Sequence, residues 1–125
     1  MKHRNLAILA LCLPLMLTAC TPSTTQPPLA PGYQNSADQQ MGEILAGARA
    51  FYVSVQQQSA AGTMTLTPTE KTAFNTFGVS LNAAETVYLA YHSNPTPATQ
   101  AAAQKAVDNV QAQQTALPMP SAVKP

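Results

Sequence analysis

The chain has 125 residues, of which 46% are hydrophobic and only 9% are charged, and its formal net charge is +1. Two of the six basic residues, Lys2 and Arg4, lie at the extreme N-terminus, so the rest of the chain carries four basic against five acidic residues, a net charge of −1. Nucleic-acid binding needs clustered Lys and Arg to displace condensed counterions. The charge pattern therefore argues against a nucleic-acid partner.

Residues 1–19 have the form of an export signal. Lys2, His3 and Arg4 precede an almost wholly apolar run over residues 6–17, which is too short to cross a bilayer as a mature helix. The run ends in Leu17-Thr18-Ala19-Cys20. These four residues resemble the lipobox of bacterial lipoproteins, which is Leu, a small or hydroxyl residue, Ala or Gly, and Cys. The alternative is an ordinary secretory leader with a cysteine at its end by chance.

The resemblance to bacterial lipoproteins implies a membrane anchor and covers about the first twenty residues. In that class the leader is cut before the cysteine, Cys20 receives diacylglycerol, and the new amino terminus is often acylated with a fatty acid such as palmitate. Two or three chains make such attachment effectively permanent, since each buried methylene contributes about 0.8 kcal/mol. In that class, an Asp directly after the modified cysteine tends to retain the protein in the inner membrane, and this chain has Thr21 at that position. The resemblance thus implies the periplasmic face of the outer membrane, or the cell membrane of a source with one membrane.

Cleavage and lipidation would leave the folded part without a thiol, because Cys12 lies in the leader and Cys20 carries lipid. Neither a disulfide nor a cysteine metal site is then expected, and no cofactor is implied. Residues 20–35 are rich in Pro, Ser, Thr and Gln and contain almost no aliphatic side chain. Such a segment buries too little apolar surface to order itself, so it predicts a flexible tether about 45 Å long when extended.

The first predicted helix begins at Ser36, because Ser36-Ala37-Asp38-Gln39 has the form of a capping box with Asp38 in the first turn. Apolar residues then recur at spacings of three and four along one face, namely Met41, Ile44, Ala48, Phe51 and Val55, with Leu45 and Tyr52 beside them. Gly62 is the predicted left-handed cap that ends this helix.

Two Thr-Pro pairs predict the starts of two further helices. Thr67-Pro68-Thr69-Glu70 is a capping box with proline at the first helical position, and Pro95 limits this helix at Asn94. Its apolar stripe is Phe74, Phe77, Leu81, Ala84, Tyr88 and Tyr91. Thr96-Pro97 starts an Ala- and Gln-rich helix that Pro118 ends, with the thinner stripe Ala103, Ala106, Val107, Val110 and Leu117.

These elements predict an all-α fold, a small three-helix up-down-up bundle over residues 36–117, followed by a disordered tail over 118–125. We expect the first and second helices to form the better-packed pair. Gly42, Gly47 and Gly78 lie inside predicted helices, where each Gly costs roughly 1 kcal/mol of stability relative to Ala. Their presence is explained either by close approach of another helix or by neutral drift.

Few side chains are candidates for chemistry. His92 lacks a second His, a Cys or a nearby run of carboxylates, so it is interpreted as a cation at a helix C-terminus, and Glu43 and Glu85 as solvated surface. No catalytic motif appears, which predicts a protein that is not an enzyme. Tyr52, Tyr88 and Tyr91 belong either to the core or to the rim of a partner-binding groove.

The leading functional hypothesis is a non-enzymatic envelope lipoprotein that binds or scaffolds another envelope protein. A second hypothesis is a helical carrier of a small apolar ligand, held between the first two helices by Phe51, Phe74 and Phe77. The third is a structural lipoprotein that contacts murein. It ranks last because Lys124 is followed by Pro125, where the covalently attached type has a terminal lysine.

Overall fold

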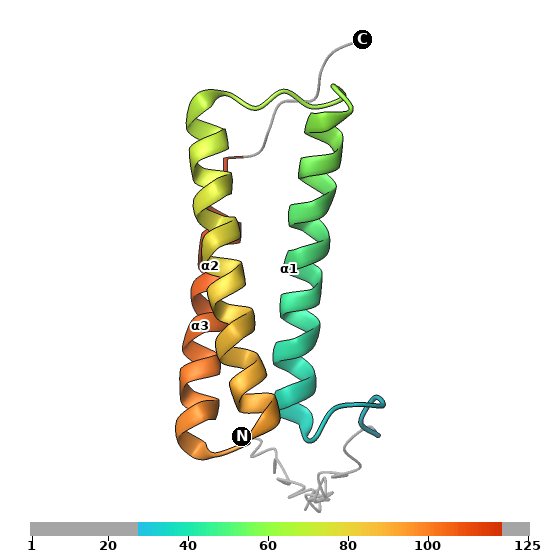
Figure 1. Cartoon of the computed structure of the whole chain (residues 1–125), viewed down its shortest axis with the longest axis vertical. Coiled ribbons are helices and arrows are strands. Elements are labelled where there is room, and N and C mark those ends of the chain that lie inside the picture. The colour runs from blue at the N-terminus through green and yellow to red at the C-terminus, as the bar shows by residue number, and fades with distance from the viewer. Residues whose placement is uncertain (1–27, 119–125) are drawn as a thin grey trace, which may run out of the picture.

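The computed structural model describes residues 28–118, and within this range the chain folds into three α-helices. α1 spans Ser36–Ala60, α2 spans Pro68–Ser93 and α3 spans Pro97–Ala116. Figure 1 shows the helices running in alternate directions, joined by short connections. The predicted all-α, up-down-up bundle is therefore confirmed. The predicted leader, the lipobox with Cys20, most of the tether and most of the tail lie outside the described residues.

α1 begins at Ser36, as predicted, but its N-cap differs from the predicted one. Asn35, not Ser36, is the N-cap, and its Oδ1 accepts a hydrogen bond from the amide of Asp38 at 2.9 Å. Gln39 does not close a capping box, because its side-chain oxygen accepts from the amide of Ala30 at 3.1 Å. Asn35 is favoured over Ser36 because the same oxygen also accepts from the hydroxyl of Tyr91 on α2.

The other helix boundaries confirm the sequence signals. Gly62 has a φ of +74°, and the amides of Gly62 and Thr63 donate to the carbonyls of Ser59 and Gln58, as in a Schellman motif. Thr67 and Glu70 form the predicted capping box of α2. Thr96 caps α3 in the same way, with Thr99 as its partner. α2 ends at Ser93 and α3 at Ala116, each shortly before a proline.

The core lies along the axis where the three helices meet, and it contains residues from all of them. Leu81, Ala103, Val107 and Val110 have no exposed surface. The remaining buried apolar residues are Met41, Leu45, Ala48, Val55, Phe74, Phe77, Ala84 and Tyr91. Leu45 takes the central place on α1, while Ile44 and Phe51 lie at the edge of the core.

The expectation that α1 and α2 would be the better-packed pair is wrong, because the backbones of α2 and α3 approach each other most extensively. The buried side chains of α3 are small, namely Ala103, Val107 and Val110, and small side chains allow this approach. The α1–α2 interface instead contains aromatic rings. Tyr52 stacks on Phe74 with ring centroids 4.8 Å apart, and Phe51 contacts Phe74 and Phe77 edge-on at 6.1 Å. These rings lie between α1 and α2.

Candidate functional site

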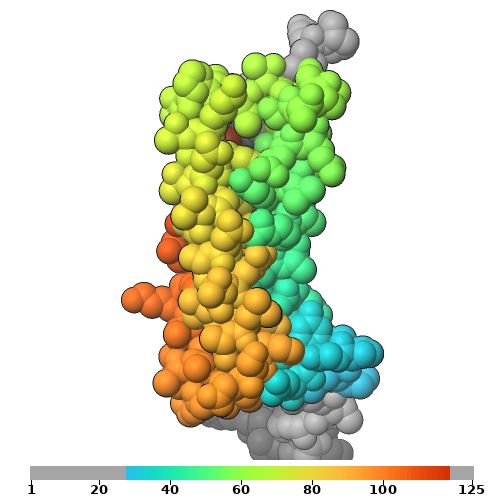
Figure 2. All heavy atoms as spheres, viewed as in Figure 1, coloured from blue at the N-terminus to red at the C-terminus, as the bar shows by residue number. Residues whose placement is uncertain are grey.

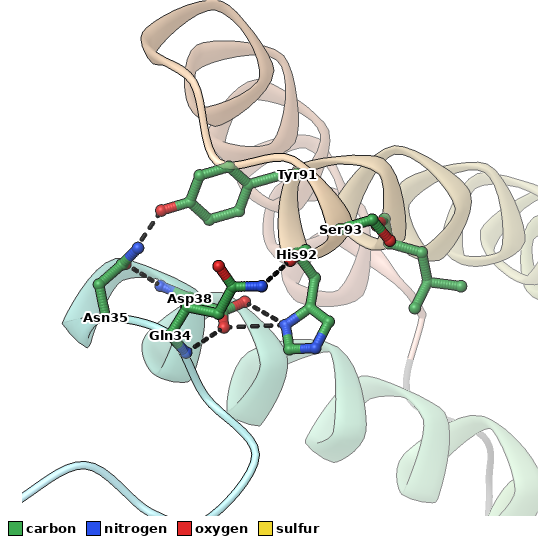
Figure 3. A network of polar contacts seen from close by, with 7 residues as sticks. Gln34, Asn35, Asp38, Tyr91, His92 and Ser93 are labelled. Atoms are coloured by element: carbon green, nitrogen blue, oxygen red, sulfur yellow. Dashed lines mark hydrogen bonds and ion pairs between the residues drawn. The ribbon is translucent and has the colours of Figure 1, made fainter.

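A group of polar side chains gathers at the end of the bundle where the chain enters α1. We call this end the tether end and the group the tether-end cluster (Figure 3). Its residues come from the segment before α1, from the first turn of α1 and from the last two turns of α2: Gln34, Asn35, Asp38, Tyr88, Tyr91 and His92.

Asp38 is the centre of this cluster and is only 1% exposed. Its carboxylate accepts from the backbone amide of Gln34 at 2.8 Å and lies 2.8 and 3.0 Å from Nδ1 of His92. The hydroxyl of Tyr88 lies near this carboxylate and acts on it as well. Burial by itself raises the pKa of Asp38, but the hydrogen bonds from Gln34, His92 and Tyr88 outweigh it and hold this pKa below the ordinary value.

The interpretation of His92 as an isolated cation at a helix C-terminus is wrong in one respect, because His92 has a buried carboxylate partner. Asp38 lies 54 residues earlier in the chain, and only the packing of α1 against α2 brings the two together. The Asp38 carboxylate also fixes the orientation of the imidazole, with Nδ1 turned inward. The hydroxyl of the adjacent Ser93 donates to the carbonyl of Leu89 at 2.8 Å and is therefore not held by the imidazole as a nucleophile.

The cluster also binds the last residues of the predicted tether to the bundle. The side-chain amide of Gln34 donates to the carbonyl of His92, and Oδ1 of Asn35 accepts from the hydroxyl of Tyr91 at 2.9 Å. The amide of Ala30 donates to Gln39. The tether was predicted to extend to residue 35, but its contacts with α1 and α2 begin at Ala30.

Glycines on α1 and α2 make room for tyrosine rings. A Cβ atom on Gly42 would lie 2.7 Å from Cε1 of Tyr33 and 2.7 Å from the hydroxyl oxygen of Tyr88. A Cβ atom on Gly78 would lie 2.6 Å from Cζ of Tyr52. Close approach therefore accounts for these two glycines, although the groups that approach them are rings and not helix backbones.

The structure places the three candidate partner-binding tyrosines in different surroundings. Tyr91 is 2% exposed and belongs to the core. Tyr88 is half-buried beside Asp38, and both burial and the Asp38 carboxylate raise its pKa. Tyr52 is half-buried on Phe74, in the half of the bundle nearer the α1–α2 connection. Partner binding by these three residues stays a prediction.

Glu85 is not simply solvated surface, because it pairs with Arg49 across the α1–α2 interface. Nε of Arg49 donates to Oε1 of Glu85 at 2.9 Å, and the second guanidinium contact reaches Oε2. This pairing raises the pKa of Arg49. Glu43 is exposed, as predicted, and accepts from the side chain of Gln39 at 2.7 Å.

The side of α2 that faces away from α1 and α3 carries exposed apolar side chains. Val79, which is 69% exposed, lies near its middle. We call this surface the α2 outer face, and α2 lies uncovered at the front of Figure 2. Helical spacing aligns six exposed, uncharged residues on it: Thr72, Thr76, Val79, Ala83, Thr86 and Ala90. Leu89, which is 58% exposed, lies about a quarter turn around the helix from this face, on the side of Asn82, which contacts Arg49 of α1.

The hydroxyl groups of the α2 outer face are already paired within the helix. Thr72, Thr76 and Thr86 each donate to the carbonyl four residues earlier at 3.0 Å. Their hydrogen-bonding capacity is thus partly used, and their methyl groups add to the apolar surface of Val79, Ala83 and Ala90. A partner that covers this face would therefore displace water from few hydrogen-bond donors.

An open groove of about 370 Å³ lies at the other end of the bundle, beside the α1–α2 connection. Phe74, Leu66 and Ala60 supply apolar surface and Lys71 supplies the positive charge; Gln56, Ser59 and Asn75 complete the lining. Of the three phenylalanines predicted to hold an apolar ligand, Phe74 reaches this groove, whereas Phe77 is 1% exposed and packs against the other rings.

Comparison with protein-family models, curated proteins and solved structures finds no match to this chain. Within residues 28–118, none of the helices is long and apolar enough to cross a membrane. The same part of the chain brings together no group of three or more His, Cys, Asp or Glu side chains that could hold a metal ion.

Proposed function

We propose that this chain is a non-enzymatic envelope lipoprotein. In this proposal lipid on Cys20 anchors it to a membrane outside the cytoplasm, and the three-helix bundle binds another envelope protein through the α2 outer face. The lipobox-like residues 17–20 support the anchor. The exposure of Val79 on an uncharged helix face of Thr and Ala residues is the observation that carries the binding surface.

The α2 outer face suits a helix or a flat apolar surface of the partner. Water must be removed from both sides when such a complex forms, and burial of apolar area contributes about 25 cal/mol per Å². The threonine hydroxyls keep their intrahelical bonds during this step, so their desolvation is cheap. Ala83 and Ala90 lie between the larger side chains and permit close approach.

Site-specific photo-crosslinking in intact cells tests the binding surface. A photoreactive residue at Val79 should capture one discrete envelope protein, and the same residue at Gln104, exposed on α3, should not. With the photoreactive residue kept at Val79, Ala83→Glu combined with Thr86→Glu should abolish the capture while the helical circular dichroism is retained. Equal capture from α2 and α3, or none from α2, would contradict the binding surface.

The anchor needs its own test. Mass spectrometry of the mature protein should find diacylglycerol on Cys20, and Cys20→Ser should release the protein from the membrane fraction. A free thiol at Cys20 would overturn the anchor and leave the α2 outer face untouched.

The groove beside Phe74 favours one second candidate, a carrier of a small amphipathic ligand. Lys71 at its rim would pair with an anionic head group, and Leu66 and Phe74 would contact the apolar part. A fluorescent fatty acid should then bind saturably, and Lys71→Ala should weaken the binding. Binding unchanged by Lys71→Ala, or no saturable binding, would dismiss this candidate.

A further inference from the structure

We infer that the tether-end cluster is an acid-opened latch, in which protonation of Asp38 frees residues 30–35 from the bundle while the three helices stay packed. The closed latch is drawn in Figure 3, where Gln34 and Asn35 lie between the first turn of α1 and the end of α2.

The hydrogen bonds that the Asp38 carboxylate accepts are strongest when it is ionised. The backbone amide of Gln34 can only donate, and a protonated His92 can only donate through Nδ1. A neutral carboxyl group has an O–H that would point at these donors, so protonation breaks part of the set. Loss of charge on His92 has a smaller effect, because a neutral imidazole that keeps its Nδ1–H still donates to the carboxylate.

The groups that surround Asp38 identify it as the residue of the tether-end cluster that responds to acid. On α2 they are His92 and Tyr88, and on the incoming segment the backbone of Gln34. Tyr33 and Tyr91 lie near Tyr88, and α3 contributes no group that acts on Asp38 within the described part of the chain. Tyrosines do not titrate in acid, and Asp38 is the carboxylate buried among these groups.

The latch can open without unfolding the bundle, because the two depend on different contacts. Residues 30–35 are held by hydrogen bonds to Asp38, Gln39, Tyr91 and His92 and by the ring of Tyr33 over Gly42. None of residues 30–35 belongs to the buried apolar core. The helices pack through Leu81, Val107, Val110 and the other core residues. Segments with few buried apolar contacts open at a lower free energy than the whole domain.

Opening would lengthen the tether. At about 3.1 Å per residue, the extended chain from Cys20 spans about 31 Å to Ala30 and about 50 Å to Ser36. This gain in reach rests on the proposed lipid anchor, but the latch itself does not.

A nitroxide spin label on Leu29→Cys in the mature, membrane-extracted protein tests the latch, since Leu29 is exposed and adjoins the first latch contact at Ala30. We expect a restricted label at neutral pH. Well below the ordinary aspartate pKa of 3.8, the mobile component should become the major one while helical circular dichroism is unchanged. Asp38→Asn should remove this pH response, and Asp108→Asn, which changes an exposed carboxyl on α3 away from the latch, should keep it.

Three outcomes would overturn the latch. The first is a label that stays restricted at every acid pH. The second is a release of the label that coincides with loss of helix. The third is a pH response of Asp38→Asn that equals the response of the protein with Asp38. Protein without the Leu29→Cys substitution is the control for the anchor, because label uptake by it would reveal a free Cys20. That result counts against the proposed anchor alone, so the two failures are distinguishable.

Discussion

The two ends of the bundle are held together by different chemistry. At the tether end a buried carboxylate, Asp38, is surrounded by Gln34, Tyr88 and His92. Toward the α1–α2 connection, Phe51, Tyr52, Phe74 and Phe77 form an aromatic group. Apolar burial stabilises without demanding one partner geometry, whereas a buried charge is tolerated only when particular donors surround it. The comparison teaches that the aromatic group supplies stability, and the tether-end cluster determines where the incoming chain is attached.

The largest effect is expected from the aromatic group. Phe77→Ala should lower the free energy of unfolding by about 3–5 kcal/mol, because it removes a fully buried ring and leaves a cavity. Urea denaturation measures the change. Val79→Ala, two residues later on the α2 outer face, should stay within about 0.5 kcal/mol. Similar losses from both variants would show that the aromatic group is not the stabilising part.

At the tether end, Asp38→Ala should cost about 2–3 kcal/mol, because it leaves the donors of Gln34 and His92 without their acceptor. The pKa of Asp38 is lowered in the folded protein, so its ionisation stabilises the fold above the ordinary value of 3.8. This contribution is lost as the pH falls through the lowered pKa. Urea midpoints measured from neutral to acid pH should therefore fall less in Asp38→Asn than in the unmodified protein. A steeper fall in Asp38→Asn would contradict the assignment.

The glycines sharpen the comparison because each end contains one that receives a tyrosine ring. Gly78→Ala should cost about 1–3 kcal/mol, since the new Cβ collides with the ring of Tyr52. Gly47→Ala is the matched control. Nothing lies within 4 Å of its new Cβ, so it should stabilise the protein by about 0.5–1 kcal/mol. Thermal unfolding should separate the two variants in opposite directions, and a shared direction would refute the role of Tyr52.

The smallest effect is expected from the ion pair between the two ends. The side chains of Arg49 and Glu85 are 33% and 31% exposed, and solvent screens their attraction. A double-mutant cycle of Arg49→Ala and Glu85→Ala should give a coupling free energy of about 0.2–1 kcal/mol that falls with added salt. A larger, salt-independent coupling would place this pair among the determinants of the α1–α2 interface.

Local sequence signals predicted the helices well, because each signal acts within one turn of chain. Thr67 with Glu70, Gly62 and Pro95 mark boundaries where the structure has them. The first residue of α1 was predicted, but its N-cap was missed, because Asn35 and Ser36 are both residue types that cap helices. Asn35 is also held by the hydroxyl of Tyr91 on α2, which the sequence does not show. Helical periodicity placed Tyr91 on the apolar stripe, but it could not tell that Tyr52 and Tyr88 lie over glycines.

The sequence by itself determined the number of helices, their ends and their apolar faces, because capping, proline geometry and periodicity are local properties. The pairing of Asp38 with His92, the attachment of residues 30–35 and the closest helix pair were decided by the tertiary structure. Those features depend on which side chains meet across α1, α2 and α3. A periodic pattern shows which face of a helix is buried, but the packing of the whole bundle decides which side chains that face contacts.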